Sequence, residues 1–157
     1  MTAGDKQVAE PILARLDALI VALGEDAEAL GPLPADMDAF RAMDRSRRIA
    51  SRALLKSVEQ TADQLARFFR LLPVLMLTAT AGWYAQDYAN FAEGLGVLDD
   101  SFAWTTIIRL RNRLVHDYPL QPEAQLDLLS QAHAAMPLLI RTAQTARAFV
   151  ENKGLLT

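Results

Sequence analysis

The chain has 157 residues and a formal net charge of −3, and 52% of its residues are hydrophobic. This length suits one domain with a buried core, and the acidic balance argues against a protein that coats nucleic acid non-specifically. The sequence contains no cysteine, which excludes disulfides and thiolate metal sites.

Helical periodicity is the main signal in the first part of the chain. Between Val8 and Leu23, apolar residues recur three and four positions apart, which predicts a helix with one buried stripe. No basic segment followed by an apolar run precedes this helix, so we expect no secretory signal. Residues 31–34, which read GPLP, break the pattern and predict a stiff link.

A long second helix is predicted after this link. It begins at Asp36 or Asp38, since either aspartate can cap it, and extends to Leu72, either without interruption or with a kink near Asp44. Pro73 then ends or kinks the helix. The apolar stripe of this helix comprises Ile49, Ala53, Leu54, Val58, Leu65, Phe68 and Phe69.

Residues 73–85 fit either a continuing helix or a packed loop around Gly82. The most apolar stretch of the chain, 71–81, is too short to span a bilayer. With no secretory signal and no membrane segment, we expect a soluble, cytoplasmic protein whose single domain covers residues 1–157.

Further helices are predicted in the second half. Residues 86–95 form a short helix that Gly96 closes in a left-handed conformation. A helix over 102–116 follows, Pro119 ends it, and a final helix covers 122–152. The N-cap candidates for the helix over 102–116 are Asp99, Asp100 and Ser101. The pattern predicts an all-α, antiparallel bundle of about five helices.

The segment 111–118, which reads RNRLVHDY, brings a guanidinium, an amide, an imidazole and a phenol together near the end of a predicted helix. Four residues separate Arg111 from His116, and Tyr118 follows after one more. These groups suit the binding of a phosphate and the transfer of a proton beside it. They also have a purely structural interpretation, because cations near a helix C-terminus interact favourably with the helix dipole.

Helix geometry separates two of these groups within one chain. Asn112 and His116 are four residues apart and share a face, whereas Arg111 and His116 diverge by about 140° in an ideal helix. Either the last turn unwinds and Arg111 reaches round, or two copies of the helix meet across a twofold axis. The second arrangement places two arginines and two histidines in one cleft.

RNA chemistry favours the arrangement with two copies. Cleavage without a metal ion needs a base to take the 2′-hydroxyl proton and an acid to protonate the departing 5′-oxygen. A neutral and a protonated imidazole can share these tasks near neutral pH, and arginine can stabilise the charge that develops on phosphorus. The products would be a 2′,3′-cyclic phosphate and a 5′-hydroxyl end.

The run RLRNRLVHDYP, residues 109–119, resembles the signature of the HEPN superfamily, and in particular of the HepT-like toxins. The shared pattern is Arg, four intervening residues of which the first is Asn, then His, one residue, and Tyr. Upstream, residues 88–102 are similar to the short third helix of that family and its turn into the motif helix. The resemblance covers about residues 45–150, is most specific over 84–120, and does not include the N-terminal helix and Pro-rich link of residues 1–44.

The resemblance implies an all-α bundle that dimerises, with a ribonuclease site at the dimer cleft. By position, Arg111 and His116 would be catalytic, Asn112 would orient the site, and Tyr118 would be the regulatory residue. Toxins of this family pair with a small nucleotidyltransferase antitoxin of the MNT type, which silences them by transferring AMP to the motif tyrosine. Phosphate charge added beside Arg111 would block the place of the substrate phosphate.

Two features of the second helix bear on this site. The family often has an acidic or polar residue there that faces the cleft, and Glu59 or Asp63 would serve. A basic block over residues 41–56 is either a solvated helix face or a surface that attracts phosphate or an acidic partner. The bases of this block are Arg41, Arg45, Arg47, Arg48, Arg52 and Lys56.

The sequence therefore predicts a homodimeric endoribonuclease toxin that acts on RNA and needs neither a metal ion nor a cofactor. One alternative is a HEPN-fold partner of a nucleotidyltransferase that has no chemistry of its own, and another is a purely structural dimer. The chain contains no HExxH, P-loop or GxGxxG motif, so zinc peptidase, kinase and dinucleotide-binding functions have no support.

Overall fold

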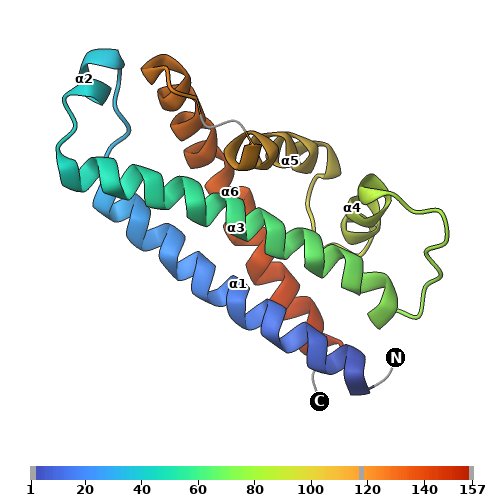
Figure 1. The fold of residues 1–157 in the computed structure, drawn as a ribbon. Helices are drawn as coiled ribbons and strands as arrows, with labels where there is room; N and C mark the ends of the chain where they lie inside the picture. Colours follow the sequence, from blue (N-terminus) through green and yellow to red (C-terminus); the bar gives the residue numbers. More distant parts are fainter. Residues whose placement is uncertain (1–2, 117–118, 156–157) are drawn as a thin grey trace.

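Six α-helices make up the computed structural model, which describes residues 3–116 and 119–155 (Figure 1). No strand occurs in these ranges, so the prediction of an all-α fold is confirmed, although the expected number of helices is one too low. None of the described helices is both long and apolar enough to cross a membrane. The helices are α1 (Ala3–Leu30), α2 (Met37–Arg41), α3 (Arg45–Leu75), α4 (Ala85–Gly94), α5 (Ser101–His116) and α6 (Pro122–Asn152).

The sequence left open an uninterrupted second helix or a kink near Asp44, and the uninterrupted helix is wrong, because the chain breaks at residues 42–44 into α2 and α3. Each of the two helices has its own aspartate cap. The side chain of Asp36 accepts a hydrogen bond from the backbone N–H of Ala39, and that of Asp44 accepts one from Arg47, both at 2.8 Å. Such caps satisfy N–H groups that have no partner inside a helix. Met43 lies in the break and is buried, so core packing favours the interruption.

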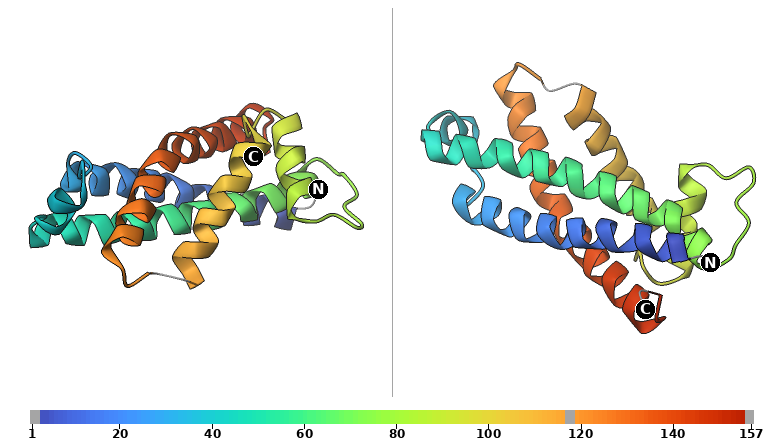
Figure 2. Two further views of the ribbon diagram at one scale, coloured as in Figure 1. Left: turned by 90° about the horizontal axis from the view of Figure 1, so that it is seen from above. Right: turned by 60° about the horizontal axis from the view of Figure 1, so that its bottom comes forward.

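Helix α3 lies at the centre of the bundle. Helix α1 runs antiparallel beside it, and α6 crosses the pair on the far side in the view of Figure 1. Helices α4 and α5 also pack on α3, and α5 contacts α6 as well. Helix α5 crosses α3 steeply, and its last turns extend past α3 (Figure 2, left). The crossing places the end of the motif helix at the edge of the bundle.

The core contains buried side chains from every helix except α2. Phe68 and Phe69 of α3 are its largest fully buried residues, and the ring of Phe69 meets that of Trp104 of α5 edge-on, with 4.9 Å between the centroids. Ile49 is 54% exposed, so its placement in the buried stripe is wrong. The α1 stripe is confirmed, with Leu16, Leu19 and Leu23 buried and Ile12 and Ile20 packed beside them.

Helix α3 passes Pro73 and ends at Leu75, so the alternative in which Pro73 ends the helix is wrong. Proline removes one N–H donor from a helix, but the residues after it keep theirs. The backbone N–H of Met76, for example, still donates to the carbonyl of Leu72 at 2.9 Å. Residues 76–84 form the loop to α4, which agrees with the loop alternative for most of this segment, but none of these residues is buried and Gly82 is exposed, so the expected packing around Gly82 is wrong.

Leu77 closes α3 in a left-handed conformation, with φ of 55°. The N–H of Thr78 donates to the carbonyl of Pro73 at 2.8 Å, and the N–H of Leu77 donates to that of Val74 at 3.2 Å. These two bonds define a Schellman motif, whose left-handed position is usually glycine. Helix α4 ends with the same motif at Gly96, whose φ is 77°, as the sequence predicted.

An ionic cluster around Arg147 ties α6 to α1. The guanidinium donates a hydrogen bond to Asp17 of α1 and lies 3.6 Å from Glu10 of the same helix. Glu151, one turn further along α6, lies 3.8 Å away. The hydrogen bond with Asp17 raises the pKa of Arg147 above its ordinary value, so this residue keeps its charge at every pH at which the cluster can form.

Candidate functional site

Helix α5 carries the motif residues, and its buried face determines where they point. The side chain of Asp100 caps the helix by accepting hydrogen bonds from two backbone N–H groups of the first turn. Ile107 and Leu110 are buried, and Leu114 packs against the same core, as the sequence predicted. With this stripe turned inward, Arg111 lies at its edge and contacts α3.

An ion pair between Arg111 and Asp63 joins α5 to α3 beside this stripe. Arg111 Nε donates to Asp63 Oδ1 at 2.6 Å, and the two side chains are 29% and 35% exposed. Hydrogen bonds between charged groups are shorter and stronger than neutral ones. The structure thus brings one of the two acidic candidates of α3 into contact with the motif arginine.

Asn112 supplies a second contact to the same guanidinium. Its side-chain oxygen accepts a hydrogen bond from Arg111 Nη1 at 3.2 Å. A guanidinium has five N–H donors, so these two hydrogen bonds to described residues leave three N–H groups for a ligand. Because Asp63 and Asn112 both hold it, the guanidinium is oriented before a ligand arrives.

His116 is the last residue of α5 and is exposed. Helix α5 is continuous from Arg111 to His116, so the unwound last turn is not found and the two side chains leave different sides of the helix. No hydrogen bond joins the side chain of His116 to another residue within 3–116 or 119–155. One copy of the chain therefore does not bring Arg111 and His116 together.

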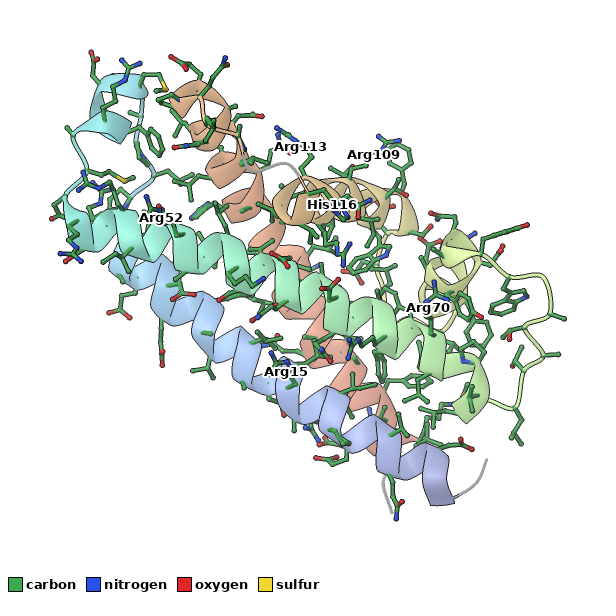
Figure 3. The ribbon with its side chains drawn as sticks, viewed as in Figure 1. Arg15, Arg52, Arg70, Arg109, Arg113 and His116 are labelled. Carbon is green, nitrogen blue, oxygen red and sulfur yellow. The ribbon has the colours of Figure 1, made fainter. Side chains whose placement is uncertain are left out.

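Two more arginines extend from α5 on the side away from α3, Arg109 and Arg113 (Figure 3). Arg113 Nη1 lies 3.6 Å from Asp127 Oδ2 of α6, while Arg109 is exposed. The spacing of Arg109, Asn112 and His116 places them on one broad face of the helix, and all three are exposed. The imidazole thus lies on a face that also carries positive charge.

A hollow of about 250 Å³ lies between α3 and α5. Its lining residues are Arg52, Leu55, Lys56, Glu59 and Leu114. Glu59, the other acidic candidate, lies here rather than at Arg111, and its side chain accepts a hydrogen bond from Lys56 Nζ at 3.0 Å. The basic side chains that line this hollow are visible in the sequence, but the hollow itself is not, because it forms only where α5 crosses α3.

Tyr118, the predicted regulatory residue, lies outside the described residues. Within the described ranges, no group of three or more His, Asp or Glu side chains could hold a metal ion. Of the other predicted residues, Arg111, Asn112 and Asp63 meet in one chain, and His116 lies apart from them.

Comparisons of this chain with protein-family models, with curated proteins and with solved structures found no match. The structure provides the oriented guanidinium of Arg111 and, on the same helix α5, the exposed imidazole of His116. The hollow between α3 and α5 adds the cationic side chains of Arg52 and Lys56. These groups are suited to binding phosphate and transferring protons.

Proposed function

We propose that this protein is an endoribonuclease that needs no metal ion, acts as a homodimer and serves as the toxin of a two-gene module. The observation that carries the proposal is the guanidinium of Arg111, which Asp63 and Asn112 hold with three N–H groups left over. A cation oriented in this way can bind two oxygens of one phosphate. The spacing of Arg111 to His116 resembles the HEPN signature, which supports RNA as the phosphate-bearing substrate.

A second copy of the chain would complete this site, since Arg111 and His116 leave one continuous helix in different directions. The exposed face of α5 includes Phe102, which is 81% exposed. Beside that face, a largely apolar groove of about 330 Å³ runs between α5 and α6. Exposed apolar surface of this kind is typical of subunit interfaces. Pairing α5 with α5 across a twofold axis would bring each imidazole towards the guanidinium of the other copy.

In the proposed reaction, a neutral His116 takes the proton of an RNA 2′-hydroxyl, and the 2′-oxygen attacks the adjacent phosphorus. The protonated His116 of the second copy gives its proton to the departing 5′-oxygen. Arg111 binds the non-bridging oxygens and stabilises the negative charge that builds up on phosphorus. The reaction ends with a 2′,3′-cyclic phosphate on one fragment and a 5′-hydroxyl on the other.

The proposed antitoxin is a small nucleotidyltransferase of the MNT type, which would transfer AMP to Tyr118. Tyr118 belongs to the same signature as Arg111 and His116. An AMP group there would add phosphate charge near Arg111, and this phosphate would compete with that of the substrate. The resemblance to HepT-like toxins supports this part of the proposal.

Cleavage of single-stranded RNA by the purified chain in EDTA tests the nuclease proposal. We expect cleavage to persist in the chelator and to leave 2′,3′-cyclic phosphate ends. His116→Ala should lower the rate by at least about a hundredfold, because general acid and base catalysis contributes about 10²- to 10⁴-fold. His133→Ala is the matched control, since it changes the only other histidine, which is exposed on α6. That variant should cleave RNA at the wild-type rate.

Each arm of this experiment has an outcome that contradicts the proposal. A fully active His116→Ala protein would exclude the nuclease mechanism, and a monomer that cleaves RNA would exclude two imidazoles in one cleft. An inactive chain that still binds the nucleotidyltransferase would favour the alternative of a binding partner that has no catalytic activity of its own.

Modification of Tyr118 is a separate test. With ATP and magnesium, the nucleotidyltransferase should add the mass of AMP to the wild type but not to Tyr118→Phe. An unmodified wild type would contradict the role of Tyr118.

A further inference from the structure

Arg52 differs from Arg41, Arg47 and Arg48 of the basic block in its side-chain contacts. Arg47 and Arg48 donate to backbone carbonyl oxygens, and Arg41 pairs with a glutamate of α6. Arg52 is exposed, and its side chain makes no hydrogen bond or ion pair with any residue that the structure describes. Its guanidinium therefore remains available to a ligand.

Arg52 also lines two hollows that adjoin each other along α3. One is the hollow of about 250 Å³ that it shares with Lys56 between α3 and α5. The other, of about 150 Å³, lies among α2, α3 and the start of α6, and Arg41 and Arg48 line it too. Figure 3 shows Arg52 on the part of α3 between α5 and α2. Arg45 is exposed like Arg52 but lines neither hollow.

One stripe of α3 connects Arg52 to the Arg111 site. Arg52, Lys56, Glu59 and Asp63 follow one another at steps of four, three and four, which keeps them on one face of the helix. Asp63 at the end of this stripe holds Arg111. With a rise of about 1.5 Å per residue, Lys56 lies about 10 Å and Arg52 about 16 Å from Asp63 along the helix axis. A few nucleotides of single-stranded RNA can span this separation.

The lining of the first hollow suits a nucleotide better than a bare anion. Leu55 and Leu114 supply apolar surface beside the cationic groups. A ribose and a base can lie on such surface while the phosphate lies on the cations. Glu59 accepts a hydrogen bond from Lys56 and so holds the ammonium group at the hollow.

We propose that this hollow is a phosphate subsite for single-stranded RNA, in which Arg52 and Lys56 bind the phosphodiester of a nucleotide next to the cleaved one. The subsite rests on the proposed nuclease function and extends the binding surface for its substrate. Neither side chain touches the reacting atoms, so both determine affinity and register rather than the rate of the chemical step.

Binding of an RNA that cannot be cleaved tests the subsite separately from catalysis. The probe is a fluorescein-labelled single strand with 2′-O-methyl groups, and its anisotropy gives the Kd. Arg52→Gln should raise the Kd about tenfold through loss of a charge-assisted contact. The same change should reduce the slope of log K against log salt by about 0.7, the value for one phosphate contact on a single strand.

Arg45→Gln is the matched control, because it removes the same charge from the same block without changing either hollow. Its Kd should stay within about twofold of the wild type. An equal loss of affinity in Arg45→Gln would indicate diffuse attraction and would overturn the subsite, as would an unchanged Kd in Arg52→Gln. Binding of polyglutamate that depends on Arg52, without binding of RNA, would also overturn it in favour of an acidic protein partner.

Cleavage assays separate this inference from the nuclease proposal. His116→Ala should lose cleavage but bind the 2′-O-methyl strand with wild-type affinity. If the wild type cleaves no RNA and Arg52→Gln still weakens binding, the nuclease proposal fails and the phosphate subsite remains. If the wild type cleaves RNA and binds it independently of Arg52, the nuclease proposal remains and the subsite is excluded.

Discussion

At the scale of single residues, Asp63 holds the guanidinium of Arg111 through a hydrogen bond of 2.6 Å. Asp63→Asn keeps the shape of the side chain but removes its charge. We expect RNA cleavage to fall by about tenfold to a hundredfold, the usual loss when a residue that orients a ligand-binding group is changed. The free energy of unfolding should fall by at most about 1 kcal/mol, because the pair is about one third exposed. Cleavage rates and urea unfolding measure the two effects.

Asp127→Asn provides the control for this prediction. It removes the carboxylate that lies near Arg113. Arg113 is on the same helix as Arg111 but extends from the side of that helix away from α3. Cleavage should be unchanged in this variant, and Asp63→Glu, which keeps a carboxylate, should retain more activity than Asp63→Asn. An equal loss of cleavage in both asparagine variants would show that Asp63 has no special role.

The sequence named candidate residues for the site but did not predict which of them are in contact. The spacing of Arg111 and His116 already predicts that they diverge, and the continuous α5 agrees. The choice between Glu59 and Asp63 could not be made, because they are one turn apart on the same face of α3. Only the point where α5 crosses α3 decides it, and that point depends on packing between distant parts of the chain.

At the scale of elements, the two matching helix ends at Leu77 and Gly96 offer a direct test of backbone strain. A left-handed conformation costs a non-glycine residue about 1–2 kcal/mol, because its Cβ approaches the following carbonyl oxygen. Leu77 is also 75% exposed, so little packing offsets this cost. Leu77→Gly should therefore raise the free energy of unfolding by about 1 kcal/mol, less the entropy that glycine adds to the unfolded chain. Thermal and urea unfolding measure the change.

The reverse substitution at the end of α4 is the partner of this test. Gly96 has nearly the same backbone geometry as Leu77, and no described residue other than its two chain neighbours has an atom within 4 Å of where its Cβ would be. Gly96→Leu should lower the free energy of unfolding by about 1–2 kcal/mol, through conformation rather than through a clash. Loss of stability in Leu77→Gly would mean that contacts of this leucine outweigh its strain.

Local signals predicted the ends of some helices but not the division between α2 and α3. Gly96 marked the end of α4, and Pro122 marked the start of α6, because each residue has a strong backbone preference at that position. The sequence indicated at most a kink near Asp44 rather than a full break, because the residues around Met43 also fit the helical period. The cause of the break is the burial of Met43 together with the cap at Asp44, and only the folded chain shows that combination.

At the scale of the whole molecule, the Arg147 cluster makes part of the stability depend on salt. The pKa of Arg147 is higher in the folded than in the unfolded state. Its charge therefore contributes fully to the free energy of unfolding below the unfolded pKa, and this contribution is lost only as the pH rises through the higher folded pKa. Titration of Arg147 itself therefore does not change the free energy of unfolding between acidic and moderately alkaline pH. Arg147→Gln should lower the free energy of unfolding by about 1 kcal/mol at low salt. The difference should shrink at high salt, since salt screens exposed charges.

Arg15→Gln is the control for the cluster. Arg15 is an exposed cation on α1 that makes no ion pair with the described part of the chain (Figure 3). Its replacement should change the free energy of unfolding by less than about 0.5 kcal/mol at either salt concentration. A loss in Arg147→Gln that stays constant with salt would indicate packing of the long side chain rather than charge.

The all-α class of the fold was predictable, whereas the arrangement of its helices was not. Amphipathic stripes predict which face of a helix is buried, but they do not identify the helix that covers it. Helix α3 illustrates the difference, because four other helices pack on it. That central position, and the hollow that results from it, depend on contacts between segments far apart in the sequence.

Helix α3 presents two independent surfaces along one straight segment of backbone. Its inward side holds the aromatic pair Phe68 and Phe69, while Arg52 and Lys56 lie on its solvent side. Replacing Arg52 and Lys56 with other polar side chains leaves the buried core unchanged. Ligand preference can therefore be redesigned on this surface, or drift in the course of evolution, while resistance to heat and denaturant is retained.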